Sequence, residues 1–251
     1  MPDENVSGVP PAGRLTYPCR LHVPGDNHLL QLLPDDERAR LKASMERVTT
    51  RRRDVLFERR EPIAYVDFPL RGVVSIVVVM KEGGIAEVGT IGNEGMSGVP
   101  LLLGAESSIT HAFYQVPGES LRMTAHAFNA EIARKGPFEN VLRRYAQGYL
   151  SQVSQSTACN RLHDVEQRLC KWILMCHDRL GENVVPLTQE FIAEMLGVRR
   201  ASVSVVAATL QKAGLIRYSR GVIEVLDRTR MEESSCECYA VVREEFERLL
   251  C

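Results

Sequence analysis

The chain has 251 residues, of which 45% are apolar and 25% are charged, and its formal net charge is −1. This composition is typical of a soluble globular protein with one large domain or two ordinary ones. No run of about 18 apolar residues occurs, so a transmembrane helix is excluded, and the near-zero net charge by itself indicates no class of partner.

The first segment, residues 1–27, is acidic and rich in proline and glycine. It has neither the basic start nor the apolar stretch of a secretion signal. We therefore expect a short flexible arm on a cytoplasmic protein that has no membrane partner.

Residues 28–136 are expected to form one sensor-type domain. Regularly spaced leucines predict a short helix from His28 to Met45. From about Arg53 to Phe128, β-rich runs such as VVSIVVVM alternate with turns that contain glycine. Several short strands separated by glycine turns indicate an antiparallel sandwich or roll.

Gly136-Pro137 marks the start of a long predicted helix that covers residues 137–163. One stripe of side chains recurs at spacings of three and four along it. A helix of this length has no obvious partner on a small roll, which favours dimerisation through the stripe over packing against the core of the same chain. The dimerisation residues predicted in this way are Leu142, Tyr145, Tyr149, Val153 and Ser156.

Residues 164–230 combine a helix over Asp164–Leu180 with two shorter helices and a hairpin. Thr188 stands at the N-cap position of the first short helix, and Gly197 allows a tight turn before a second helix that starts near Arg199. Val203, Val206, Ala207 and Leu210 form the inner face of that second helix. Helix, glycine turn and helix are typical of a helix-turn-helix motif, whose second helix enters the major groove of DNA.

The leading end of the second helix carries two adjacent arginines and two small hydroxyl residues, which suit contacts to phosphates and base edges. Two β-runs around Ser219-Arg220-Gly221 predict a basic wing. Between Thr188 and Arg230 there are seven Lys/Arg against four Asp/Glu. This local basic excess is weak additional support for nucleic-acid binding. The candidate DNA-binding residues from these observations are Arg199, Arg200, Ser202, Ser204, Arg217, Ser219 and Arg220.

Seven cysteines occur without any C-x-x-C pair, so a zinc ribbon or finger is not expected. Cys159 and His163 are four residues apart, and Cys236 and Cys238 are two apart. For each pair we favour packed or exposed thiols over metal binding or redox sensing, and we assign no metal site. The last segment, residues 231–251, predicts one helix that packs on the winged helix or along a partner subunit.

The stretches TQEFIAEMLGVRRASVSVVAATLQKAGLIRYSRGVIEV and VGTIGNEGMSGVPLLLG give the chain a resemblance to the cyclic-AMP receptor protein/FNR (Crp/Fnr) superfamily of bacterial regulators. The resemblance implies an α+β fold with a cyclic-nucleotide-binding-type β-roll, a long dimerisation helix and a C-terminal winged helix-turn-helix. It also implies a homodimer that binds palindromic operators in double-stranded DNA, with RNA polymerase as a further partner. It adds Thr188 and Gln189 as contacts to the DNA backbone.

Two departures from the superfamily pattern limit what the resemblance implies. Gly98 is followed by Val99 and Pro100 instead of glutamate, and Ile109-Thr110 stands where cyclic-nucleotide-binding members have an arginine. We therefore expect no cyclic AMP binding, no evident cofactor and an unknown effector. The recognition helix lacks the superfamily's glutamate and second arginine, so the target sequence remains open, as does activation or repression. The arm has only Cys19, so the cysteine cluster of the iron–sulfur relatives is missing.

Two alternatives belong to other classes of protein. One is a signalling or adaptor protein whose roll binds a small ligand and which does not bind DNA. The other is an enzyme, but the sequence has no glycine-rich phosphate loop, no paired histidine ligands and no G-x-S-x-G elbow. We therefore expect a non-enzymatic regulator.

Overall fold

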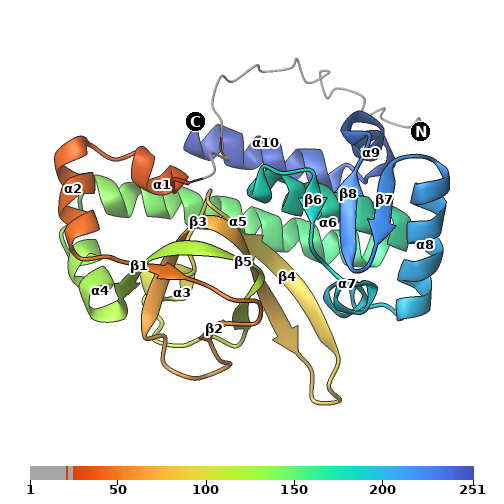
Figure 1. The fold of residues 1–251 in the computed structure, drawn as a ribbon. Coiled ribbons are helices and arrows are strands. Elements are labelled where there is room, and N and C mark those ends of the chain that lie inside the picture. Colours follow the sequence, from red (N-terminus) through yellow and green to blue (C-terminus); the bar gives the residue numbers. More distant parts are fainter. Residues whose placement is uncertain (1–20, 22–24) are drawn as a thin grey trace, which may run out of the picture.

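The computed structural model describes Leu21 and residues 25–251, and it runs from a β-roll through one long helix to a small C-terminal domain (Figure 1). The roll is a five-stranded antiparallel sheet of order β1-β5-β3-β4, with β2 also paired to β5. This architecture confirms the predicted α+β class. Most of the N-terminal arm, with Cys19, lies outside the described residues. The strands are β1 (Glu46–Thr49), β2 (Val55–Phe57), β3 (Tyr65–Val79), β4 (Ile85–Ile91) and β5 (His111–Thr124).

Two long strands, β3 and β5, form the body of the roll. β3 is rich in β-branched and aromatic residues, and most of its side chains are buried on both faces of the sheet. β3 continues into β4 through a tight turn in which Gly83 has a φ of +82°, a backbone conformation that glycine adopts without strain. The predicted roll with glycine turns is therefore present.

Four short helices surround the roll: α1 (His28–Gln31), α2 (Asp35–Ala43), α3 (Val99–Leu102) and α4 (Ala125–Ala133). The prediction of one helix from His28 to Met45 was wrong. Pro34 is the N-cap of α2 and has an extended backbone, because its ring and missing N–H prevent it from continuing α1. The leucine pattern was correct, since Leu29, Leu30, Leu33 and Leu41 are all buried.

The long helix α5 (Pro137–Leu162) begins and ends close to its predicted bounds. Its apolar stripe, however, packs within the same chain. Leu142 is 0% exposed and Tyr145 is 1% exposed, and both belong to the core of the roll. The assignment of Leu142 and Tyr145 to a dimer interface is therefore corrected: they face their own β-roll. Tyr149, Val153 and Ser156 keep partial exposure.

The C-terminal domain contains α6 (Val165–Leu180), α7 (Gln189–Leu196) and α8 (Arg200–Lys212). A three-stranded sheet of order β6-β8-β7 completes it. The core of this domain is continuous with one side of the roll, where Val73, Val77 and Phe113 join the side chains of α6 and α7. The strands of the small sheet are β6 (Val184–Val185), β7 (Ile216–Ser219) and β8 (Val222–Val225).

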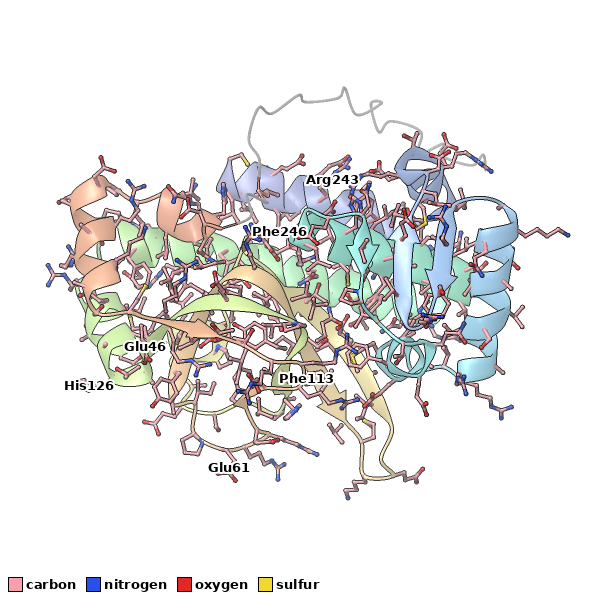
Figure 2. All side chains as sticks on the ribbon, in the orientation of Figure 1. Glu46, Glu61, Phe113, His126, Arg243 and Phe246 are labelled. Atoms are coloured by element: carbon pink, nitrogen blue, oxygen red, sulfur yellow. The ribbon has the colours of Figure 1, made fainter. Side chains whose placement is uncertain are left out.

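The last segment forms two helices, α9 (Arg228–Ser234) and α10 (Cys238–Leu250), where one helix was predicted. α10, which carries Arg243 and Phe246 (Figure 2), lies along α5 of the same chain, and its Tyr239 joins the core of the C-terminal domain. Phe246 packs on Tyr145 with a distance of 6.1 Å between ring centroids. A Cβ on Gly148 of α5 would lie 2.9 Å from the Phe246 ring, so the two helices approach closely because this residue is glycine. The predicted packing of this segment on the winged helix is thus present through Met231 and Tyr239, while the contact of α10 with α5 was not predicted.

Within the described part of the chain, no helix is both long and apolar enough to cross a membrane.

Candidate nucleic-acid interface

The turn of the helix-turn-helix has the local signals that the sequence predicts. Thr188 caps α7, since its hydroxyl accepts a hydrogen bond of 3.2 Å from the Phe191 N–H. Gly197 ends α7 with a φ of +64°, a left-handed conformation that L side chains rarely adopt. The chain then turns through Val198 and Arg199 into α8, and Arg199 is the N-cap of that helix.

The second helix, α8, has one buried face and one exposed face. Val203, Ala207 and Leu210 are buried in the domain. Ala201 and Ala208 are exposed, and Val205 is 68% exposed. α8 also lies at the outer edge of the molecule (Figure 1). A narrow helix with small outward side chains fits a major groove about 12 Å wide.

Arg199 and Arg200 are exposed at the leading end of α8, where the sequence placed them. Ser202 and Ser204 are half-buried. The Ser204 hydroxyl donates a hydrogen bond of 2.6 Å to the side-chain oxygen of Gln189, which ties the start of α7 to α8. This bond fixes the Gln189 amide and leaves its NH₂ group as a donor.

The predicted wing is the hairpin of β7 and β8, with Ser219 opposite Val222. Arg220 and Gly221 form the two-residue turn, and both have a positive φ, +51° and +78°. Positive φ at both positions is typical of a type I′ hairpin turn. Ser219 and Arg220 are exposed at the tip.

Arg217, another of the predicted DNA-binding residues, lies within strand β7 and not at the tip of the wing. Its Nη1 atom is 2.5 Å from the Oε2 atom of Glu224 on the neighbouring strand β8. The pairing of a cation with a carboxylate across the hairpin lowers the net positive charge there. Arg217 is thus a weaker candidate for phosphate contact than Arg220.

An open hollow of about 410 Å³ lies between the start of α7, the start of α8 and the wing. A Cβ on Gly221 would lie 3.1 Å from the Thr188 methyl group, so the wing closely approaches α7. Three of the residues that line the hollow, Thr188, Gln189 and Arg200, were predicted to bind DNA. Glu190 and Tyr218 also line it and were not predicted at the interface. Its lining residues are Thr188, Gln189, Glu190, Arg200, Tyr218 and Gly221.

A further basic segment that the sequence analysis missed lies in the loop between β1 and β2. Arg53 pairs with Glu194 of α7 at 2.9 Å, and its guanidinium lies 5.6 Å from the centre of the Phe191 ring. Arg52 donates a hydrogen bond to the Pro186 carbonyl. The three consecutive arginines, residues 51–53, are visible in the sequence. Their position beside α7, however, depends on how the roll packs against that helix.

Comparison with known proteins agrees with this geometry. Residues 167–234 match the model of the Crp-like helix-turn-helix domain. FixK2 from Bradyrhizobium japonicum is similar in structure, with a TM-score of 0.66 and 15% identity over 76% of this chain and 98% of that chain. A CRP-family transcriptional regulator from Thermus thermophilus gives a TM-score of 0.61 and 19% identity over 76% and 96%. No curated protein matches the sequence.

The architecture is that of a two-domain protein, in which a long helix joins a β-roll to a winged helix-turn-helix of the DNA-binding type. Residues 167–234 thus form a Crp-like helix-turn-helix domain, and the chain shares the fold of these solved Crp/Fnr-type proteins.

Proposed function

We propose that the protein is a homodimeric regulator of transcription that binds specific sequences in double-stranded DNA. The main support for this proposal is that the leading end of α8 and the tip of the wing lie on one exposed surface. Arg199 and Arg200 lie on the first element and Arg220 on the second, and Thr188 lies between them. Guanidinium groups in this arrangement suit contacts to a guanine edge and to flanking phosphates.

Dimerisation is proposed through the face of α5 that the subunit leaves exposed. Its exposed residues recur at spacings of three and four, so they form one stripe along the helix. Leu150 is 47% exposed in the middle of it. A two-fold axis along this stripe would relate two copies of α8 and would favour a palindromic operator. The stripe consists of Arg143, Gln147, Leu150, Ser154, Thr157 and Arg161.

The roll is proposed to act without a cyclic nucleotide. The Tyr145 hydroxyl donates to the Met96 carbonyl at 3.2 Å, and a Cβ on Gly95 would lie 2.4 Å from that hydroxyl, so this part of the roll is filled by protein. The cavity between β4, α5 and α6 measures about 30 Å³, which is room for about one water molecule. The effector is left open, and RNA polymerase is a proposed partner.

Cyclic AMP and cyclic GMP are expected to give no measurable heat of binding when either is titrated into the protein by calorimetry. The physical reason is that Ile109 and Thr110 supply no positive charge for a phosphate. Micromolar or tighter binding of either nucleotide would contradict this expectation.

The function is tested by selecting duplexes from a random library and then measuring binding in gel-shift titrations. Replacing Arg200 with alanine is expected to weaken binding to the selected operator roughly 10-fold, because one bidentate contact is lost. Arg199→Ala is expected to have an effect of similar size and to reduce the salt dependence by about one phosphate contact.

Lys212→Ala is the matched control, since Lys212 is exposed at the far end of the same helix. It should change affinity by no more than about 2-fold, because it lies away from the leading end of the helix. If the folded arginine variants bind as well as the wild type, or if no duplex is enriched at low salt, the adaptor function becomes the better explanation.

A further inference from the structure

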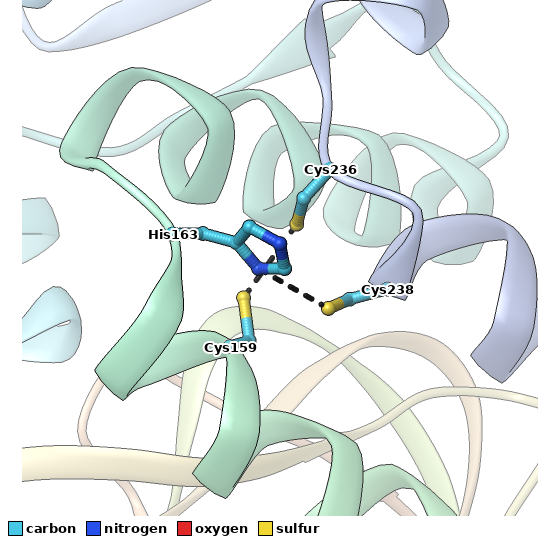
Figure 3. A group of neighbouring side chains, drawn as sticks. All are labelled: Cys159, His163, Cys236 and Cys238. Carbon is cyan, nitrogen blue, oxygen red and sulfur yellow. Dashed lines mark hydrogen bonds between the residues drawn. The ribbon is translucent and has the colours of Figure 1, made fainter. Parts of the chain in front are cut away.

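Three cysteines and one histidine meet where the long helix α5 ends (Figure 3). Cys159 lies in the last turn of α5, and His163 is the C-cap of that helix. Cys236 lies in the break between α9 and α10, and Cys238 is the first residue of α10. The four possible ligand atoms all lie within 4.8 Å of one another.

Two of the distances between these atoms are close to the edges of a tetrahedral zinc site. The Sγ atoms of Cys159 and Cys236 are 3.6 Å apart, and the Sγ atom of Cys238 is 3.5 Å from the Nδ1 atom of His163. Zn–S bonds of about 2.3 Å and Zn–N bonds of about 2.0–2.1 Å in a tetrahedron give edges of about 3.7 Å and 3.5 Å. The sulfur separation is far longer than the roughly 2.05 Å of a disulfide bond.

The imidazole of His163 is oriented for metal binding. Its Nε2 atom lies 3.2 Å from a carboxylate oxygen of Glu237, which is the residue between the two cysteines. A proton on Nε2 therefore has an acceptor, and the Nδ1 lone pair is left facing the sulfur atoms. Histidine ligands of zinc usually donate their second ring N–H in this way.

A hydrogen-bond donor and two cations also lie beside the sulfur atoms. Gln155 donates to the Sγ atom of Cys238 at 3.2 Å. Three thiolates and Zn²⁺ would carry a net charge of −1, which the nearby cations Lys171 and Arg168 offset.

We propose that Cys159, His163, Cys236 and Cys238 bind one Zn²⁺ ion that fastens the start of α10 to the end of α5. All three cysteine side chains are nearly inaccessible, at 0%, 3% and 0% exposure, so the site is closed as structural zinc sites are. The compact spacing suits a single ion, because an iron–sulfur cluster holds its protein ligands on different iron atoms.

The site lies next to the DNA-binding domain, so a bound ion would have a structural role there. α5 ends at His163 and α6 begins after its N-cap Asp164, so the ligands border the junction between the two helices. On α6, Arg168 donates a hydrogen bond of 2.5 Å to the Leu196 carbonyl at the end of α7. Zinc would thus hold α10 against the same junction that supports the helix-turn-helix.

The test starts from full-length wild-type protein, purified under reducing conditions and analysed for metals by mass spectrometry. The expected content is one zinc per chain. After removal of the metal with a chelator, titration with Co²⁺ is expected to give the visible bands of a tetrahedral site and the sulfur-to-cobalt charge-transfer absorption. This spectrum needs no variant, so it does not depend on whether a substituted chain folds.

Cys159→Ala and Cys238→Ala are each expected to lower Zn²⁺ affinity 10-fold or more in competition with a chromophoric chelator, because a ligand is lost. Cys170→Ala is the matched control: Cys170 is fully buried in α6 but is not part of the cluster, so one zinc per chain should remain. The proposal is overturned if the reduced wild type binds neither Zn²⁺ nor Co²⁺. Iron with acid-labile sulfide, or full zinc retention by both ligand variants, would overturn it as well.

Discussion

Replacing Arg179 with methionine is expected to lower the free energy of unfolding by about 3–5 kcal/mol, because the buried carboxylate of Glu94 loses the charge and hydrogen bonds of the guanidinium. Arg179 belongs to α6, and Glu94 belongs to a glycine-rich loop of the roll. The Nη2 and Nε atoms of Arg179 lie 2.7 Å and 3.0 Å from one carboxylate oxygen. The side chains are only 5% and 1% exposed, so water cannot replace the lost partner.

The Glu94 carboxylate also accepts the N–H of Gly92, at 3.0 Å to one oxygen and 3.2 Å to the other. Glu94→Gln keeps an acceptor for this N–H but removes the negative charge. Combining it with Arg179→Met should therefore restore part of the lost stability, since the buried side chain at position 94 is then neutral. The comparison separates the cost of a buried charge from the cost of lost packing.

Urea denaturation followed by circular dichroism measures both variants. Arg217→Met is the matched control, because the ion pair of Arg217 with Glu224 is 64% and 38% exposed. Such a pair is worth at most about 1 kcal/mol. If Arg179→Met costs no more than Arg217→Met, the buried pair does not stabilise the junction between the roll and the DNA-binding domain.

The parts of the fold that the sequence predicted well are those with strong local signals. Thr188 caps α7 and Gly197 ends it because each conformation depends on one residue and its near neighbours. The hairpin turn at Arg220-Gly221 and the start of α5 after Gly136-Pro137 are likewise set by one or two residues and their near neighbours. The outward face of α8 followed from periodicity, since a helix with one apolar stripe exposes the other side.

Predictions failed where the partner of a surface had to be known. Periodicity indicated that Leu142 and Tyr145 are buried, but it could not say whether a second subunit or the chain's own roll covers them. Phe246 lies about a hundred residues further along the chain, and its contact with Tyr145 depends on the way α10 folds back. The break between α9 and α10 likewise has no proline or glycine to mark it.

The cluster of three cysteines and one histidine could not be predicted for the same reason, because it depends on which helices pack together. Cys159 with His163 and Cys236 with Cys238 are each a common pattern, and packed thiols are the ordinary explanation for either pair. The two pairs are more than 70 residues apart in the sequence. Only the packing of α10 on α5 joins them into a set of four ligands, so no local rule could have found it.

The second large effect concerns Glu87, whose raised pKa should make the protein less stable as pH rises. Burial raises the pKa of Glu87 from 4.5 to about 7, against hydrogen bonds from Ser75 and Trp172 that favour the charged form. The Ser75 hydroxyl lies 2.5 Å from one carboxylate oxygen, and the Trp172 Nε1 atom lies 2.7 Å from the other. The native state therefore binds a proton more tightly than the unfolded chain.

The sign of the effect follows from this difference in proton binding. The stabilising contribution of the protonated carboxyl is complete below pH 4.5, and it is lost as pH rises through about 7. The full shift would correspond to about 3 kcal/mol. Because the Glu87 side chain keeps partial contact with solvent, we expect about 2 kcal/mol. Arg179 and Lys171 of α6 face the carboxyl group and limit the rise in its pKa.

Glu87→Gln keeps an acceptor for the Trp172 N–H and a donor for Ser75, but it cannot ionise. Relative to the wild type, its stability should improve by about 2 kcal/mol between pH 5 and pH 8, because only the wild type must bury a charge at the higher pH. Urea titrations at both pH values measure this difference in stability. Groups other than Glu87 titrate in both proteins, so their contributions cancel when the variant is compared with the wild type. Glu82→Gln, at an exposed position in the β3–β4 turn, should show no such change. A parallel pH dependence in wild type and Glu87→Gln would mean that the Glu87 carboxyl group titrates as it does in water.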